Sequence, residues 1–323
     1  MIITVTLNPA IDQTIEIERL IEGDTNRVAA IRWDIGGKGI NVARMLKELG
    51  YEPLASGFAP GDLGRMIEDS LLDSGIGCEF IFVPGETRTN ITILDRETHR
   101  DTVLAAAGPR VTQHHISLLR ARLNRRLRPH GQSWLVLAGS MPPGCDPALY
   151  ADLLGMAAER GAHSAVDADG DVVAAILSGG AAPNLLKLNE HEAGRLLGRS
   201  IDEEAGAIEA ARTLRSWGLE QVVITRGGEG AVAMTSEGGF RVGALDVEVQ
   251  SAVGAGDAFL AGLIFGLVRD RGWVASLTTA TAAGAAACLA PGTARGRAAD
   301  ARRLEGQVRV EALREPATHA APA

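Results

Sequence analysis

A chain of 323 residues, 46% of them hydrophobic, can bury a full core as one large α/β domain with an appendage or as two domains. The formal charge of −8 argues against a general binder of nucleic acid or membrane surfaces, which would present a basic face. Three widely spaced cysteines without a C-x-x-C pair give no sign of a disulfide framework or structural zinc, so we expect a cytoplasmic protein. The first residues do not resemble a signal peptide, and no apolar run reaches the roughly 18 residues of a membrane span.

Short apolar strands alternate with helical stretches along most of the chain. The β-branched run Ile2 to Leu7 predicts a strand, which Asn8-Pro9 ends. From Asn41 to Leu49 the apolar residues recur at helical spacing, and Gly50 follows as a C-cap residue would. The alternation returns in Trp134 to Ala138 with Pro147 to Arg160, in Ala165 to Val166, in Leu185 to Leu188 with Glu190 to Leu197, and in Val222 to Thr225. This order predicts the α/β class, with a doubly wound, mainly parallel sheet flanked by helices.

Two segments break this alternation. Gln13 to Trp33 and Thr87 to Asp95 contain apolar and polar residues in turn, which is typical of antiparallel strands with one solvated face. We expect them to form a small β-sheet that serves as a lid. The edges of such strands would otherwise present unpaired backbone groups to solvent, so we also expect a homodimer through the lid. In that dimer, Arg27 would reach toward the partner subunit.

The patterns predict one domain at residues 1–310, with lid strands from 13–33 and 87–104. Residues 311–323 are predicted to be a flexible tail, because the end of the chain is rich in proline and alanine. Before the tail, Ala258 to Leu267 and Ser276 to Leu289 are rich in small residues, which predicts helices that pack closely inside the fold.

The most informative segment is Val253-Gly254-Ala255-Gly256-Asp257-Ala258-Phe259, just before a long apolar helix. Small residues let backbone amides converge at a helix start, and such a start binds anions. An aspartate there can accept a proton from a hydroxyl while the amides stabilise a phosphoryl group during transfer. For the string alone, a plain glycine turn with Asp257 stabilising the helix start is the commoner interpretation.

Gly36-Gly37-Lys38-Gly39-Ile40-Asn41 places a lysine and an asparagine in a glycine loop before a helix. The backbone of such a loop can approach a polar ligand closely. The string lacks the Walker A pattern, so nucleotide phosphates need not bind there, and a simple turn with an exposed lysine is the alternative. Similarly, Arg226 to Ala231 is either a nucleotide-phosphate loop or an ordinary turn.

Asn189-Glu190-His191-Glu192 opens a helix with the spacing of a capping box, so structural capping is its first interpretation. The functional alternative places Glu192 near a hydrated Mg²⁺. Asp167, Asp169 and Asp171 resemble the start of a calcium loop. Calcium is rejected because Val172 stands where that loop requires glycine and no glutamate closes it.

Six motifs occur in an order typical of one enzyme family. They are Thr6-Leu7-Asn8-Pro9-Ala10-Ile11-Asp12, Gly36-Gly37-Lys38-Gly39-Ile40-Asn41-Val42-Ala43, Thr87-Arg88-Thr89-Asn90, Ala138-Gly139-Ser140-Met141-Pro142-Pro143-Gly144, Lys187-Leu188-Asn189-Glu190-His191-Glu192 and Val253-Gly254-Ala255-Gly256-Asp257. Together they strongly resemble the PfkB (ribokinase-like) carbohydrate kinases. Within these the chain is similar to the branch of 1-phosphofructokinases, minor 6-phosphofructokinases and tagatose-6-phosphate kinases. The resemblance extends from Met1 to about Gly292.

The resemblance implies a role for each matching residue. The catalytic base would be Asp257, and the anion hole would consist of Gly254, Ala255 and Gly256. The residues that line the sugar site would be Asp12, Gly37, Lys38 and Asn41, and those that hold its phosphate would be Arg88, Asn90 and Ser140. The residues along ATP would be Lys187, Thr225, Gly227 and Gly230. Those that position Mg²⁺, through water, and the phosphates would be Asn189 and Glu192.

The chain departs from the family pattern at three positions. Leu188 stands where proline is usual, Arg226 where an apolar residue is usual, and Ala252 where threonine commonly precedes the Gly-Ala-Gly-Asp loop. None of these changes removes a group that the chemistry requires. They bear on nucleotide affinity and on the details of the anion hole.

These observations predict a Mg²⁺·ATP-dependent phosphotransferase that converts fructose 1-phosphate to fructose 1,6-bisphosphate. Fructose carries one CH₂O arm on each side of its ring oxygen, so a site that binds phosphate on one arm and offers a base to the other is nearly symmetric. Tagatose differs from fructose only by the inversion of one hydroxyl. Activities as a 6-phosphofructokinase or a tagatose-6-phosphate kinase therefore remain alternatives. A kinase of a neutral sugar or nucleoside would not need Lys38 and Arg88. A non-catalytic sugar-phosphate sensor would not need the base and metal shell that Asp257, Asn189 and Glu192 provide.

Overall fold

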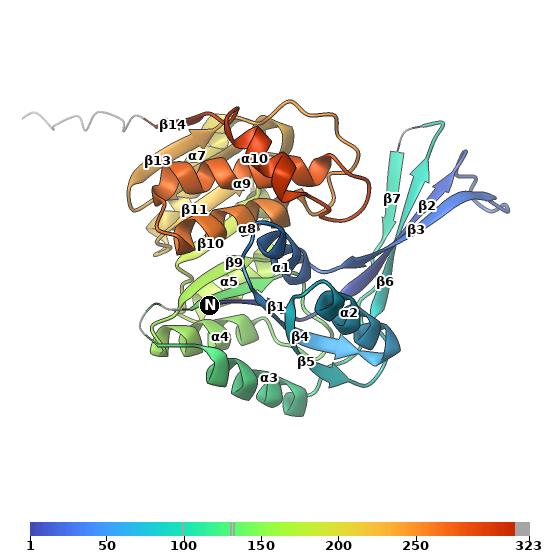
Figure 1. The fold of residues 1–323 in the computed structure, drawn as a ribbon, viewed down its shortest axis with the longest axis horizontal. Helices are drawn as coiled ribbons and strands as arrows, with labels where there is room; N and C mark the ends of the chain where they lie inside the picture. Colours follow the sequence, from blue (N-terminus) through green and yellow to red (C-terminus); the bar gives the residue numbers. More distant parts are fainter. Residues whose placement is uncertain (99, 130, 132, 314–323) are drawn as a thin grey trace, which may run out of the picture.

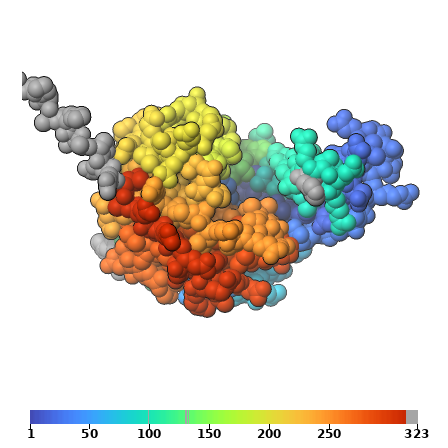
Figure 2. Space-filling model, turned by 90° about the horizontal axis from the view of Figure 1, so that it is seen from above, coloured from blue at the N-terminus to red at the C-terminus, as the bar shows by residue number. Residues whose placement is uncertain are grey.

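The computed structural model describes residues 1–98, 100–129, 131 and 133–313 (Figure 1). Within them the chain forms a large β-sheet flanked by helices and a small β-sheet that stands off the main body. Figure 2 shows the same separation from above, with the small sheet in blue and teal projecting from the rounded body. The arrangement confirms the predicted α/β class with a mainly parallel sheet.

In the described residues the large sheet has ten strands in the order β14-β13-β12-β11-β10-β9-β8-β1-β4-β5. The strands are β1 (Ile2–Thr6), β4 (Leu54–Pro60), β5 (Gly77–Val83), β8 (Trp134–Ala138), β9 (His163–Asp167), β10 (Leu185–Asn189), β11 (Val222–Thr225), β12 (Ala231–Thr235), β13 (Gly238–Val242) and β14 (Val310–Ala312). Neighbours from β5 to β11 are parallel. Those from β11 to β14 are antiparallel. Parallel neighbours need crossover connections, which explains the predicted alternation of strand and helix.

Helices cover both faces of the large sheet (Figure 1). They are α1 (Lys38–Glu48), α2 (Gly61–Asp73), α3 (Gln113–Arg126), α4 (Ala148–Glu159), α5 (Gly170–Ser178), α6 (Glu190–Leu197), α7 (Glu204–Ser216), the short 3₁₀ helix η1 (Gly227–Glu229), α8 (Ala255–Val268), α9 (Gly272–Cys288) and α10 (Ala298–Glu305). Ile3 and Val5 pack in a core cluster with residues of α3, α4, α5 and α7. Ile2 packs in a second cluster with residues of α1, α8 and α9. This two-residue period is that of a strand buried on both faces.

In the same described part of the chain, the small sheet has four strands in the order β3-β2-β6-β7. They are β2 (Ala10–Ile17), β3 (Val28–Gly36), β6 (Arg88–Asp95) and β7 (Arg100–Leu104). The prediction of antiparallel strands is correct for β2 with β3 and for β6 with β7, but β2 and β6 run parallel. The alternation of apolar and polar residues within one segment indicates that one face of its strand is solvated. It does not indicate whether that strand runs parallel or antiparallel to a strand 70 or more residues away.

Two helices begin three residues earlier than the sequence pattern indicates. Helix α1 begins at Lys38, after Gly37 as its N-cap. Helix α8 begins at Ala255, so Asp257 lies in its first turn. Apolar periodicity finds the body of a helix more readily than its polar or glycine-rich first turn.

The C-terminal boundary also differs from the predicted one. Strand β14 pairs with β13, so Glu311 and Ala312 belong to the large sheet rather than to a tail. Residues 314–323 of the predicted tail lie outside the described residues. Among the described helices, none is long and apolar enough to cross a membrane.

Candidate active site

The parallel strands bring predicted site residues together at their carboxyl ends. The register pairs Asn189 of β10 with Thr225 of β11, and Ala138 of β8 with Asp167 of β9. Asp12 lies on β2, which follows β1 after a link of only three residues. Open α/β sheets bind ligands beyond the carboxyl ends of their strands. This edge of the large sheet, below the small sheet, is therefore the candidate active site.

Asp257, the predicted base, is buried in the first turn of α8, where 6% of its surface is exposed. Its Oδ2 accepts a hydrogen bond from Asn41 Nδ2 at 2.8 Å, which connects α8 to α1. Burial raises the pKa of the Asp257 carboxyl to about 7, and the nearby negative charge of Asp167 contributes to the increase. A carboxylate with a pKa near neutrality is well matched to proton transfer at that pH.

The start of α8 presents backbone N–H groups to a ligand. Gly254 is the N-cap, and its φ of 80° is a left-handed conformation that favours glycine. The Ala255 N–H donates to the Ala252 carbonyl at 3.2 Å. The N–H groups of Gly256 and Asp257 have no hydrogen-bond partner in the described part of the chain. Because first-turn N–H groups point out of a helix and favour anions, these two amides are the most open donors of the predicted anion hole.

Asp167 is a central carboxylate that the sequence analysis considered only as part of a calcium loop. It is fully buried and accepts hydrogen bonds from Lys38 Nζ and Lys187 Nζ, each at 2.6 Å. Burial opposes ionisation, but the two ammonium groups outweigh that effect and lower the pKa of Asp167. An aspartate at the end of a parallel strand was the sequence signal that could have identified it.

Lys38 and Glu192 connect the glycine loop to α6. Lys38 Nζ donates to Glu192 Oε1 at 3.0 Å. Burial would lower the pKa of Lys38, but the Asp167 and Glu192 carboxylates raise it above its usual value. The Asn189 N–H donates to Glu192 Oε2 and the Glu192 N–H to Asn189 Oδ1, both at 2.8 Å, which completes a capping box. Glu192 therefore caps α6 through Oε2 and pairs with Lys38 through Oε1, so it can have both a structural and a functional role.

The donor set of this region fits a hydrated magnesium ion. Asn189, Glu192 and Asp167 offer oxygen atoms, which Mg²⁺ prefers. No group of three or more His, Cys, Asp or Glu within the described ranges could hold a metal ion directly. The residues therefore fit an ion that enters with nucleotide phosphates and keeps several of its waters, rather than one caged by protein ligands.

Asp12 and Asn90 occupy paired positions on β2 and β6. Asn90 Nδ2 donates to Asp12 Oδ1 at 2.9 Å, and burial raises the pKa of the Asp12 carboxyl. Gly36 lies against this pair, and a Cβ at Gly36 would overlap the Asp12 carboxylate. Gly37 follows with a φ of 124°, which glycine adopts readily. The predicted sugar-site residues of β2 and β6 therefore lie next to the glycine loop that begins at Gly36.

Arg88 brings a positive charge to the same side of the site. Its guanidinium donates to the carbonyl oxygens of Ala106 at 3.0 Å and Asn8 at 3.2 Å, and to Ser140 Oγ at 3.1 Å. All three acceptors are neutral, and no residue of the described ranges forms a salt bridge with Arg88. Hydrogen bonds to neutral groups thus fix the Arg88 guanidinium, and no anionic side chain of the described residues neutralises its charge. Lys38 differs, because two carboxylates already pair with it.

The predicted nucleotide residues are Thr225, which ends β11 beside the end of β10, and Gly227 and Gly230 of the turn that follows. Thr225 Oγ1 donates to the Leu188 carbonyl at 3.4 Å, and the Gly230 N–H donates to the Gly227 carbonyl at 3.2 Å. Lys187 does not join this turn, because its ammonium is bound to Asp167. The structure therefore places Lys187 in the buried cluster and the other three at its margin.

Arg226 ties this turn to α6. The guanidinium is buried, with 6% of the residue exposed, and it contacts the carboxylates of Glu190 at 3.6 Å and Glu229. A buried arginine in place of the usual apolar residue is tolerated here because two carboxylates compensate its charge. The departure at Arg226 thus adds an ion-pair connection between the turn and the start of α6.

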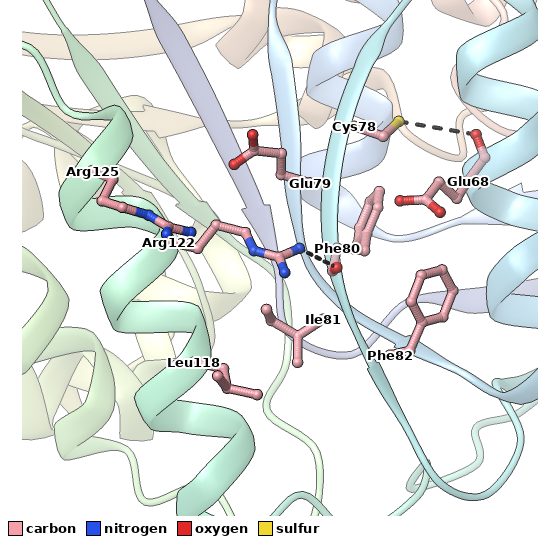
Figure 3. A pocket seen from close by; sticks show the side chains of 9 residues that line it. All are labelled: Glu68, Cys78, Glu79, Phe80, Ile81, Phe82, Leu118, Arg122 and Arg125. Atoms are coloured by element: carbon pink, nitrogen blue, oxygen red, sulfur yellow. Dashed lines mark hydrogen bonds between the residues drawn. The ribbon is translucent and has the colours of Figure 1, made fainter.

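A cavity of about 490 Å³ lies apart from this site, against the edge strand β5 (Figure 3). Its lining comes from α2, β5 and α3. Arg122 Nη1 donates to the Phe80 carbonyl at 2.7 Å and so covers one backbone group of the strand edge. Side chains that occupy edge groups in this way discourage pairing with another strand. The cavity therefore has a structural explanation and does not compete with the candidate active site.

A doubly wound sheet with a buried carboxylate at an anion-binding helix start defines an α/β kinase of the ribokinase-like class. Over residues 5–299 the chain matches the pfkB family carbohydrate kinase. The chain therefore belongs to the pfkB family of carbohydrate kinases. The family match covers the six motifs and both sheets apart from the first residues of β1 and the edge strand β14.

Individual relatives agree with this assignment. A 1-phosphofructokinase of Rhodobacter capsulatus is 34% identical over 292 residues, which are 90% of this chain and 92% of the relative. A tagatose-6-phosphate kinase of Staphylococcus epidermidis is 30% identical over 272 residues, 84% and 86% of the two chains. Phosphofructokinase-2 from Escherichia coli, solved in complex with substrates and products, superposes with a TM-score of 0.87 at 26% identity and covers 95% of this chain and 98% of its own.

Proposed function

We propose that this kinase transfers the γ-phosphoryl group of Mg²⁺·ATP to a ketohexose phosphate, with fructose 1-phosphate as the preferred acceptor and fructose 1,6-bisphosphate as the product. The observation that carries the proposal is Arg88, a partly buried cation that neutral groups hold in place and that no carboxylate of the described residues contacts. A phosphate on the sugar supplies the missing anion. The sugar-phosphate kinases among the relatives support the same substrate class.

The residues divide the reaction among themselves. Asp257 accepts the proton of the acceptor hydroxyl while that oxygen forms a bond to the γ-phosphorus and the bond to the β–γ bridging oxygen breaks, so that ADP leaves. The open amides of Gly256 and Asp257 stabilise the negative charge on the transferring group. Asn41 holds the Asp257 carboxylate in position through its 2.8 Å hydrogen bond.

Magnesium would be held through water by Asn189 and Glu192, with Asp167 behind them. When bound, the ion supplies positive charge that neutralises the nucleotide phosphates. Lys38 and Lys187 fix the Asp167 carboxylate in position before any ligand arrives, and Lys38 also fixes Glu192. The turn that contains Thr225, Gly227 and Gly230 lies next to Asn189, which supports a role along ATP.

A coupled assay of ADP release on fructose 1-phosphate, fructose 6-phosphate, tagatose 6-phosphate and fructose tests the proposal. We expect the highest kcat/KM for fructose 1-phosphate and the lowest for fructose. A preference for fructose 6-phosphate or tagatose 6-phosphate would reassign the activity within the same branch. Binding of sugar phosphates without ADP release would instead favour a non-catalytic sensor.

The small sheet also supports a homodimer. The strand register aligns side chains of one face across the four strands, and this face carries Trp33, Ile31, Ile15, Ile91, Ile93 and Leu104. Trp33, Ile31 and Leu104 are each more than half exposed. The opposite face carries Asp12 and Asn90. A second copy of the chain that packs on the apolar face would bury that face without blocking the substrate side. Arg27 is exposed in the connection between β2 and β3, and we expect it to approach the substrate phosphate of the partner subunit.

The free cysteines Cys78, Cys145 and Cys288 are consistent with a reducing compartment, and we propose a cytoplasmic location on that basis.

A further inference from the structure

The segment between α9 and α10 contacts the small sheet through an ion pair that the six motifs do not include. Arg295 Nε and Nη2 both donate to Asp34 Oδ1, at 3.0 and 2.7 Å. Asp34 is on β3, two residues before the glycine at which that strand ends, and only 2% of its side chain is exposed. Its other oxygen accepts a hydrogen bond from Arg32 Nε at 3.0 Å. A buried carboxylate with both oxygens paired fixes the position of its strand.

The same segment contacts a sugar-site residue directly. The Thr293 side chain, which is buried, lies beside the Asp12 carboxylate on β2 and slightly opposes the rise in the pKa of that carboxyl. Asp12 and Asp34 are partners in the register of β2 and β3. Two neighbouring residues of one segment, Thr293 and Arg295, therefore bind two adjacent strands of the small sheet.

On its other side the segment supports the anion hole. The Ala294 N–H donates to the Val253 carbonyl at 2.9 Å. Ala294 has a φ of 50°, a left-handed conformation that is unfavourable for a residue with a Cβ and persists only where surrounding contacts enforce it. Its Cβ lies so close to Gly254 that a Cβ at Gly254 would approach it to 2.5 Å. Ala294 thus packs directly against Gly254, the N-cap of α8.

We infer that Asp34 and Arg295 form a positioning pair that couples the small sheet to the anion hole. Through the Asp34–Arg295 contact, a displacement of the small sheet would reach Ala294, then Val253 and Gly254, and so the amides at the start of α8. Neither residue touches the reacting atoms. The functional part of this inference rests on the proposed sugar-phosphate kinase activity, whereas the mechanical coupling between the two regions does not.

Amide hydrogen exchange measures the mechanical coupling without any substrate. The variants are Asp34→Asn on the small sheet and Arg295→Met on the connecting segment. The matched control is Arg297→Met, because Arg297 lies two residues further on, is 79% exposed and pairs only with Asp300 at 3.8 Å among the described residues. We expect Asp34→Asn and Arg295→Met to accelerate exchange in residues 253–258, and Arg297→Met to leave it unchanged. Unchanged exchange there in both pair variants would overturn the inference.

Kinetics with fructose 1-phosphate and ATP then measures the functional part. Coupling through packed elements typically changes by 0.5–2 kcal/mol, so Arg295→Met should lower kcat roughly 2- to 30-fold with little change in the KM for ATP. Arg295→Lys should recover part of that loss, because it restores the charge but not the two-point contact. A fall in kcat of the same size in Arg297→Met would contradict the assignment. An inactive wild-type protein with coupled exchange would overturn the proposed function and leave the mechanical coupling supported.

Discussion

Asp257 is the residue on which the proposed chemistry depends most. We expect Asp257→Asn to lower kcat at least roughly 100-fold, as for a positioned general base, while the affinities for ATP and the sugar phosphate stay close to those of the wild type. Single-turnover kinetics together with calorimetric binding separates the two effects. A loss confined to KM would show that Asp257 only helps to bind substrate.

The raised pKa of Asp257 predicts the pH dependence of the reaction. A base must be ionised to act, so kcat/KM should fall about tenfold per pH unit below about pH 7. The second ionisation of a sugar phosphate, with a pKa of about 6, adds a further fall only at lower pH. The comparison is the pH profile of fructose 1-phosphate binding, which we expect to stay flat between pH 6.5 and 8. A profile of kcat/KM that is flat through pH 7 would contradict the assigned pKa.

The same pKa predicts a stability effect of the opposite sign to that of most carboxylates. The unfolded chain releases the Asp257 proton near pH 3.9, whereas the folded protein holds it up to about pH 7. Between these values folding takes up a proton, so stability from this group is lost as the pH rises through 7. Asp257→Asn should therefore melt at a higher temperature than the wild type at pH 8, and the difference should narrow at pH 5. Differential scanning calorimetry at both pH values measures it.

Arg88 and Lys38 were both predicted to favour a phosphorylated sugar, and the structure gives them different partners. Arg88 has only neutral contacts, so Arg88→Ala should remove a charge-assisted contact worth roughly 1.5–3 kcal/mol and lower kcat/KM for fructose 1-phosphate roughly 10- to 100-fold. The value for fructose should change little. Lys38→Ala should lower kcat for both acceptors, because it leaves Asp167 and Glu192 without a shared counter-ion. Equal losses for both sugars in Arg88→Ala would refute the phosphate role.

Local patterns made much of this site predictable. Glycine strings before helices and Asn-x-x-Glu at a helix start are determined by the local conformation of their own segment. The helix starts that contain Asp257, Asn41 and Glu192 could therefore be predicted from the sequence. Asp167 was not, because its role depends on Lys38 and Lys187, which lie 129 and 20 residues away. Asp34 was missed for the same reason, since its partner Arg295 is 261 residues away.

At the scale of elements, the strands were easier to predict than their pairing. Each strand shows its own alternation, but whether β2 runs parallel to β6 depends on the path of the chain through β4, α2 and β5. Helix starts were placed too late for a comparable reason. Lys38, Gly39, Gly256 and Asp257 carry no apolar signal, although each lies in a first helical turn that follows a glycine N-cap.

The connection between the nucleotide turn and α6 carries its own prediction. Arg226→Leu restores the apolar residue usual in the family but leaves Glu190 and Glu229 without their shared partner. If ATP binds along this turn as proposed, uncompensated carboxylates there should raise the KM for ATP, with little change in the KM for the sugar phosphate. Steady-state kinetics with each substrate varied in turn checks this. As a control, Arg199→Leu removes an ion pair with Glu209 on the surface and should leave both KM values unchanged.

For the molecule as a whole, the apolar face of the small sheet predicts the state of association. Light scattering should find the wild type as a dimer at assay concentrations, and Trp33→Arg should shift it to a monomer because burying an unpaired charge in that apolar face is costly. Val103→Arg is the matched control. Val103 is 62% exposed and pairs with Thr92 on the opposite face, so this variant should remain a dimer. A fully active wild-type monomer would refute the proposed interface.

The order of strands in the large sheet has a consequence for how the protein is made. From β8 to β14 each strand lies beside the one synthesised just before it, so the later half of the sheet can grow by successive addition as the chain leaves the ribosome. Strand β1, although synthesised first, lies between β4 and β8. A nascent chain must therefore emerge through Ala138 before its first strand has both neighbours, and closing that long loop is slow compared with local pairing. Until then one edge of β1 has unpaired backbone groups, so chaperone demand should be highest for chains that stop short of β8.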